Sequence, residues 1–400
     1  MHLMDEESME SLRTCKLFGV IRAVLGIKGA LPLIHGPVGC FYHIKYLISI
    51  RSGRQVTILS TEMDQDDVVF GGEEKLLQKI LEADQKYQPK IITVLSSCAS
   101  SIIGENIDLV LDKARNQVQC ELFSINSGGF EGTQIEGYQE CLNVLSKFMK
   151  TAPREDSVNL IGQYRGGPDL KVLKDYFKKL GLELNCILTS GCSLQDIKQV
   201  PKASLNISMC EASGVEFCQW MQREFKIPFL SETIPLGVTA TSHYFKEICR
   251  EMNREYIFEE QEEQARNEVR QFKDQLKDKK AVIVAGATRA LALTEFIYEL
   301  GMEPVLICLD FPGEYTDEKL DELIRRCNRK PVILKQPDYF EILDNAKKLN
   351  PDIILGGMGE IGLSSELRIP LIDVMHAQKT TFCFEGAVLM AGKIVDNLNG

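Results

Sequence analysis

The sequence lacks the features of several common functional classes. Its 400 residues contain no Cys-x-x-Cys pair and no Gly-x-x-x-x-Gly-Lys-Ser/Thr loop. A zinc site with the usual cysteine spacing and ATP binding through a Walker loop are therefore not predicted. The sequence also has no long run of lysine or arginine, and its formal net charge is -11. This charge argues against a nucleic-acid partner.

Long hydrophobic runs are also missing. No apolar stretch reaches the length of a membrane span, and residues 1–10 are acidic rather than arranged as a secretory signal. We therefore expect no membrane partner and a cytoplasmic location, where thiols stay reduced. The 13 cysteines are then not expected to form disulfides. Most of them fit buried small hydrophobic residues, and a few are candidate metal ligands.

The alternation of strand and helix patterns predicts an α/β protein with parallel sheets. Two segments, 159–188 and 281–309, look like copies of one strand–helix–strand unit. Each has a glycine turn after its first strand and a glycine after its helix, as in a βαβ half of a Rossmann-like domain. In the N-terminal third, a helical pattern at 73–87 precedes a continuous apolar strand at 91–95.

We therefore expect three Rossmann-like domains joined in part by a linker. A highly charged stretch around residues 259–263 indicates that the linker is a solvated helix. The expected boundaries are an N-terminal α/β domain with the candidate cysteines at 1–155, a second domain at 156–245, the charged helical linker at 246–280, a third domain at 281–375, and a C-terminal segment at 376–400 that packs back on the first domain.

Three cysteines in the N-terminal third are candidate metal ligands. Cys98 follows the strand at 91–95, and α/β folds place ligands at the carboxyl ends of their strands. Cys40 ends the turn His35-Gly-Pro-Val-Gly-Cys40, whose glycines let the backbone approach a bulky group, and Cys15 has no evident core role. Thiolates bind iron–sulfur clusters and zinc, but spacing alone leaves buried structural thiols as the alternative. A fourth ligand from another subunit would place a cluster at a dimer interface.

Longer motifs occur in order along nearly the whole chain. They are His35–Cys40, Met63–Glu73, Ser97–Ile107, Gly129–Gly132, Ser190–Ile197, Leu205–Cys210, Gly356–Gly357 and Pro370–Asp373. In this order they resemble the nitrogenase component 1 superfamily, which includes nitrogenase catalytic chains, the scaffold pair that matures the nitrogenase cofactor, the dark protochlorophyllide reductase and the nickel-tetrapyrrole reductive cyclase. The resemblance implies three Rossmann-like domains around a central cleft. It also implies that Cys15, Cys40 and Cys98 bind a subunit-bridging 4Fe-4S or larger cluster.

The resemblance points to a second cofactor site as well. Cys210 follows an apolar strand at 203–209 and matches the position that ligates the large metal cofactor in the nitrogenase catalytic chain. His376 is similar to the position of that cofactor's histidine ligand. A buried thiol and a hydrogen-bonded loop histidine are the structural alternatives. The catalytic chain also carries a histidine pair beside its cofactor, and Tyr138-Gln139 in its place argues against dinitrogen reduction.

The function implied by the resemblance is that of an iron–sulfur subunit in a nitrogenase-like two-component reductase. It would accept electrons from an ATP-dependent iron–sulfur reductase of the nitrogenase-reductase type. The bridging cluster would pass them to a substrate, a second metal cluster or a tetrapyrrole in the cleft. The partner subunit would be an identical chain or a paralogue. The alternatives are a non-catalytic scaffold for maturation of a nitrogenase-type metal cofactor and a tetrapyrrole reductase subunit.

Overall fold

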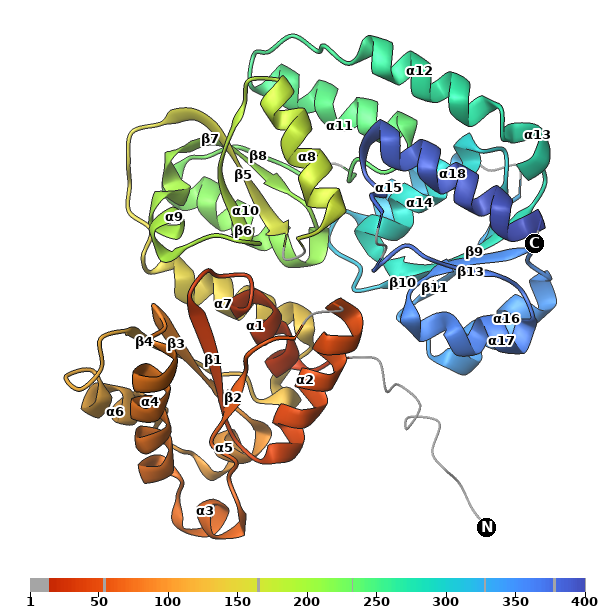
Figure 1. Ribbon diagram of the computed structural model, residues 1–400. Coiled ribbons are helices and arrows are strands. Elements are labelled where there is room, and N and C mark those ends of the chain that lie inside the picture. The colour runs from red at the N-terminus through yellow and green to blue at the C-terminus, as the bar shows by residue number, and fades with distance from the viewer. Residues whose placement is uncertain are drawn as a thin grey trace, which may run out of the picture. The chain divides into compact units, whose positions relative to one another are not determined.

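The computed structural model describes residues 14–52, 55–163, 166–231, 233–326, 329–376 and 379–399. They form two compact units, one of residues 14–152 with 186–201 and the other of residues 153–185 with 202–399. The chain contains three sheets, and every described strand pairing is parallel, which confirms the predicted α/β class (Figure 1). Within these residue ranges, no helix is both long enough and apolar enough to cross a membrane.

The first sheet carries the candidate cysteines. Its strand order is β2-β1-β3-β4, with bounds β1 (Ala30–His35), β2 (Leu59–Ser60), β3 (Ile91–Ser96) and β4 (Glu121–Ile125). All six residues of β3 are buried, which agrees with the apolar run in the sequence. Helices cover both faces of this sheet (Figure 1): α4 (Glu73–Tyr87) and α6 (Ile107–Ala114) on one face, α1 (Lys16–Val24) and α7 (Gln134–Ser146) on the other.

The second and third sheets repeat this parallel design. The second has the order β6-β5-β7-β8, with β5 (Glu155–Gln163), β6 (Glu183–Thr189), β7 (Ala203–Ser208) and β8 (Phe229–Leu230). The third has the order β11-β10-β9-β12-β13, with β9 (Lys280–Gly286), β10 (Glu303–Asp310), β11 (Val332–Lys335), β12 (Ile353–Gly356) and β13 (Leu371–Asp373).

The two predicted repeats are present as βαβ units. Helix α8 (Pro168–Lys179) connects β5 to β6, and helix α14 (Ala287–Glu299) connects β9 to β10. Gly181 and Gly301 follow these helices with φ of 66° and 78°, the left-handed conformation that glycine adopts without steric cost. The remaining α-helices of the described chain are α2 (Val38–Ser52), α3 (Gln65–Phe70), α5 (Cys98–Ile103), α9 (Leu194–Gln199), α10 (Glu211–Phe225), α11 (Val238–Glu251), α12 (Glu259–Arg270), α13 (Lys273–Leu276), α15 (Thr316–Arg325), α16 (Tyr339–Leu349), α17 (Ile361–Leu367) and α18 (Cys383–Asn399).

The charged segment differs in part from the sequence-based expectation. We expected a domain boundary at residue 245, and α11 continues through this position. Within the expected linker 246–280, Phe258 is fully buried and α12 packs on α18, so this segment is only partly solvated. The packing of residues 376–400 on the N-terminal domain stays a prediction; within its own unit, α18 packs on α11 and α12, and its Glu385 accepts a hydrogen bond from Tyr176 of α8.

Candidate metal centre

Three neighbouring strands of the first sheet end at the candidate site. β1 leads into the turn with Cys40, β3 leads into Cys98, and β4 leads into Gly128-Gly129. The strand order β2-β1-β3-β4 puts a topological switch point between β1 and β3, because the connections from these strands leave toward opposite edges of the sheet. Ligands of α/β folds bind at such points. Cys40 and Cys98 therefore stand where this architecture favours a ligand.

The thiols of the three predicted cysteines lie near one another. The Gly129 N–H donates a hydrogen bond to Cys98 Sγ over 3.1 Å. A Cβ added to Gly129 would lie 3.1 Å from Cys98 Sγ and 3.4 Å from Cys15 Sγ, so both sulfurs border the same glycine. Burial raises the pKa of the Cys40 thiol, and the nearby Cys98 and Cys15 thiols raise it further. Three thiolates this close repel one another, and positive metal ions would relieve that repulsion.

Cys15 is held by backbone hydrogen bonds and by close helix packing. It precedes α1 and pairs with Thr133 in an isolated antiparallel bridge. Lys16 N–H donates to Gly132 O over 2.8 Å on one side of this bridge. Helices α1 and α7 then approach so closely that a Cβ on Gly19 would lie 2.0 Å from the Gln134 carbonyl oxygen. The position of Cys15 thus depends on the α1–α7 contact.

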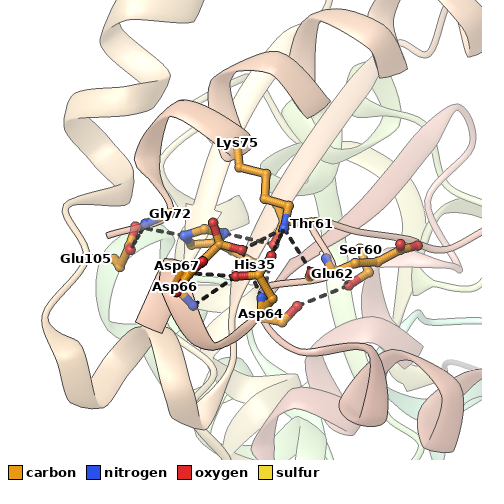
Figure 2. Close-up of polar contacts among 11 residues, drawn as sticks. His35, Ser60, Thr61, Glu62, Asp64, Asp66, Asp67, Gly72, Lys75 and Glu105 are labelled. Atoms are coloured by element: carbon orange, nitrogen blue, oxygen red, sulfur yellow. Dashed lines mark hydrogen bonds and ion pairs between the residues drawn. The ribbon is translucent and has the colours of Figure 1, made fainter. Parts of the chain in front are cut away.

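The turns that carry Cys40 and Cys98 are clamped to each other. The carbonyl of His35 accepts hydrogen bonds from Ser97 N–H over 3.2 Å and from Ser100 Oγ over 2.7 Å. A Cβ on Gly36 would lie 2.3 Å from Ser97 Oγ, so this approach requires glycine. The His35 ring, at the end of β1, lies between Thr61 and Glu105 (Figure 2). No pattern in the sequence marks Glu105 as a residue of this site, although Glu105 closes the turn that follows the Cys98 helix.

The thiol arrangement does not suit a single metal ion. Among the described residues, no three His, Cys, Asp or Glu side chains gather closely enough to hold one. A cluster of several iron and sulfide atoms is larger than one ion, so its cysteine ligands stand farther apart than those of a zinc site. The three-cysteine set therefore fits an iron–sulfur cluster better than mononuclear zinc.

Helix α2 carries an apolar face that the described residues of its own unit leave exposed. Its buried side includes Ile44 and Ile48. Four further apolar side chains follow one another every four residues on an exposed side: Val38, Tyr42, Tyr46 and Ile50. Tyr42 is 69% exposed, and its ring stacks on that of Tyr46. A helix that is apolar on both sides is typical of a buried element, so the outer side of the helix that carries Cys40 is a candidate subunit interface.

The two residues of the second candidate site occupy different sheets of one unit. Cys210 follows β7 and precedes α10, at the switch point between β5 and β7. His376 lies three residues beyond β13, and its backbone N–H donates to Asp373 Oδ1 over 2.7 Å. Its ring Nδ1 pairs with Asp373 Oδ2 over 3.4 Å. A histidine whose ring is oriented by a carboxylate is a common metal ligand.

Two further polar residues have roles that the sequence did not reveal. Tyr138 is buried and donates to Leu188 O over 2.8 Å, so it is a core residue of its unit. Glu360 follows β12 and accepts the Gly357 N–H over 2.5 Å. Burial raises the pKa of Glu360 to about 7, the hydrogen bond from Gly357 opposes the rise, and the Asp310 carboxylate adds to it. A carboxyl group that exchanges a proton near neutral pH therefore stands at the carboxyl edge of the third sheet.

The chain is similar to known proteins along nearly its whole length. The family model described as nitrogenase component 1 type oxidoreductase matches residues 15–399. The chain is 31% identical over 386 residues to the nitrogenase iron-molybdenum cofactor biosynthesis protein NifE of Clostridium pasteurianum, covering 92% of this chain and 83% of that protein. It is 29% identical over 409 residues to the nitrogenase molybdenum-iron protein alpha chain of Methanothermobacter marburgensis, covering 95% and 86%.

The fold comparison agrees with the sequence comparison. Nitrogenase Cp1, solved at pH 6.5, matches with a TM-score of 0.86 and 19% identity, over 97% of this chain and 92% of that one. At this identity the likeness shows the fold alone.

Proposed function

Because the chain belongs to the nitrogenase component 1 type oxidoreductase family, we propose that it is the iron–sulfur subunit of a nitrogenase-like two-component reductase in the cytoplasm. Cys15, Cys40 and Cys98 hold a 4Fe-4S or larger cluster. The observation that carries this proposal is the proximity of the three thiols at the switch point of the first sheet: Cys15 and Cys98 both border Gly129, and both raise the pKa of the Cys40 thiol, which burial raises most. When bound, such a cluster supplies one-electron transfer at low potential.

The chain's own groups fix and tune the bound sulfurs. The bridge between Cys15 and Thr133 and the clamp between Gly36 and Ser97 hold the ligands in place before metal arrives. The Gly129 N–H on Cys98 Sγ stabilises negative charge on sulfur. Hydrogen bonds to cluster sulfurs favour the reduced state and raise its reduction potential.

A second subunit completes the centre. The exposed apolar side of α2 supports a partner that covers it, either an identical chain or a paralogue, and Cys40 stands in the first turn of the same helix. That partner supplies the remaining ligands, since three cysteines are one short of the usual four. The cluster would then bridge two chains and be shielded from water by both.

The electron donor is an ATP-dependent iron–sulfur reductase. A second exposed apolar patch supports a docking place for it, on the neighbouring helices α3 and α5. Its side chains are Val69, Phe70 and Ile102. Because α5 begins with Cys98, a protein docked there lies close to the cluster that it reduces. Electrons pass on to a substrate, a metal cluster or a tetrapyrrole, for which Cys210 and His376 are the candidate ligands.

A scaffold for maturation of a metal cofactor is the second candidate function. It is favoured by the relative from Clostridium pasteurianum, whose name describes cofactor biosynthesis. It also agrees with Tyr138, a buried core residue where the resemblance leads one to look for a histidine beside the cofactor. A scaffold needs the same cysteines but no proton donor at that position.

Iron analysis of anaerobically purified protein tests the metal centre. We expect the wild type to contain iron and acid-labile sulfide, and Cys40→Ala and Cys98→Ala to lose the visible absorption of the cluster. Cys218→Ala is the matched control, because Cys218 is fully buried in the core of the other unit. Undiminished iron in both ligand variants would refute the assignment. Turnover with reductase, ATP and candidate substrates then distinguishes the reductase from the scaffold.

A further inference from the structure

His35 is a buried residue with both ring nitrogens engaged. Its side chain is 0% exposed, Nδ1 lies 3.1 Å from Thr61 Oγ1, and Nε2 lies 2.8 Å from Glu105 Oε2. The Glu105 side chain is only 3% exposed. Burial of a carboxylate is costly unless its oxygens are paired, so this placement requires the contacts that Glu105 makes.

Glu105 uses its second carboxylate oxygen to hold another segment. Oε1 accepts the N–H of Gly72, at the junction between α3 and α4 (Figure 2). That junction is fixed from its other side by Lys75, whose Nζ lies 2.6 Å from Asp67 and 3.3 Å from Asp64. One carboxylate therefore connects the end of β1 to a segment that is already rigid.

The same contacts reach both cysteine turns. His35 is the last residue of β1, five positions before Cys40, and its carbonyl accepts two hydrogen bonds from the start of the Cys98 helix. Glu105 follows that helix, and its own N–H donates to Ser100 O over 3.1 Å. Loss of the Glu105 side chain would thus release the His35 ring, and His35 is the residue whose carbonyl holds the start of the Cys98 helix.

We propose that Glu105 is a positioning residue for the metal centre, which holds the Cys40 and Cys98 turns in place through its paired contacts with His35 and Gly72. The inference rests on the proposed function, since it assumes that these cysteines bind a cluster. Residues that orient metal ligands without touching the metal commonly affect metal affinity about 10–100-fold.

The test compares Glu105→Ala, Glu105→Gln and wild type, each purified anaerobically with its cluster. We measure the rate at which an iron chelator removes the cluster and the reduction potential of the cluster by electron paramagnetic resonance. Glu105→Ala should lose iron about tenfold faster than wild type. Glu105→Gln keeps a carbonyl oxygen for Gly72 and an amide for His35, so its iron release and its reduction potential should stay close to wild type, whereas the potential of Glu105→Ala should shift.

Glu299→Ala is the matched control. Glu299 is also a largely buried carboxylate that binds backbone N–H groups, those of Val238 and Thr239, but it lies in the other unit. Its loss should leave both cluster readouts unchanged. Iron release and potential equal to wild type in both Glu105 variants would overturn the positioning role. A wild type without iron would instead refute the proposed function, and the inference with it.

Discussion

A methyl group at Gly19 is a sharp test of how α1 and α7 position Cys15. The added Cβ would lie 2.0 Å from the Gln134 carbonyl oxygen and 2.6 Å from its carbonyl carbon. Both atoms belong to the backbone, so no side chain can rotate away and one helix must shift. Such overpacking costs about 1–3 kcal/mol, and a cost near the upper limit is expected when the obstacle is backbone. The higher helix propensity of alanine than of glycine offsets about 1 kcal/mol of this cost. We therefore expect Gly19→Ala to lower the free energy of unfolding by about 1–2 kcal/mol.

The assay pairs thermal unfolding with iron analysis. For a unit of this size, the expected loss corresponds to a fall of about 2–8 °C in the melting temperature. Iron content should fall as well, because a shift of α1 displaces the thiol of Cys15. Gly392→Ala is the control, since a Cβ there meets only a ring atom of Phe272 at 3.7 Å, and it should be neutral or stabilising. If Gly19→Ala melts at or above the wild-type temperature and keeps its iron, the reasoning about this helix contact is wrong.

Three further variants probe other parts of the molecule. Gly36→Ala should lose most of its iron, because the added Cβ would lie 2.3 Å from Ser97 Oγ. Gly39→Ala is the control and should keep its iron, because a Cβ there meets nothing within 4 Å. Equal iron contents in the two variants would contradict the close contact between Gly36 and Ser97. Tyr42→Lys should weaken subunit association in sedimentation measurements, because it places a charge on the exposed apolar side of α2. Tyr87→Lys, at an exposed tyrosine of α4, is the control and should leave association unchanged. An unchanged oligomer in Tyr42→Lys would argue against the α2 interface. In the folded protein the pKa of Glu360 is about 7, whereas in the unfolded chain it is about 4.5. The free energy of unfolding therefore falls as the pH rises from about 4.5 to about 7. At pH 8, Glu360→Gln should therefore be more stable than wild type by roughly 2–3 kcal/mol and melt at a higher temperature, whereas at pH 5 the two proteins should differ little. A stability difference that is larger at pH 5 than at pH 8 would refute the raised pKa.

Local patterns in the sequence predicted the local structure well. The predicted helical face of Leu76, Ile80, Ala83 and Tyr87 is buried in α4 at its first three positions, whereas Tyr87 at the end of the helix is 42% exposed. The helix has the predicted bounds, and the apolar run at 91–95 became the buried strand β3. These predictions succeed because hydrophobic periodicity reports which side of an element faces the core. The helix after β3 begins at Cys98 itself, because Ser97 caps it by accepting the Ser100 N–H.

Contacts between distant segments could not be predicted in this way. The pairing of His35 with Glu105 joins residues 70 positions apart, and no periodicity marks either of them. The packing of α18 on α11 and α12 likewise depends on the three-dimensional path of the chain. The sequence around Glu360 shows only a charged residue in a glycine-rich turn. The raised pKa of Glu360 could not be predicted from it, because that shift results from burial in the folded protein.

Strand order shows what the spacing of the cysteines in the sequence could not, namely that Cys98 and Cys210 follow strands that border a switch point of their sheets. The first two sheets share one arrangement, in which the first strand lies between the second and the third. In each sheet the switch point falls beside the first and third strands, and the residues that follow the third strands there include Cys98 and Cys210. A cysteine at the end of an apolar strand is therefore a stronger metal candidate when that strand borders a switch point than when it lies at a sheet edge. By this criterion Cys210 is better placed than His376, which follows the edge strand β13, so a ligand at the second site should depend more on Cys210.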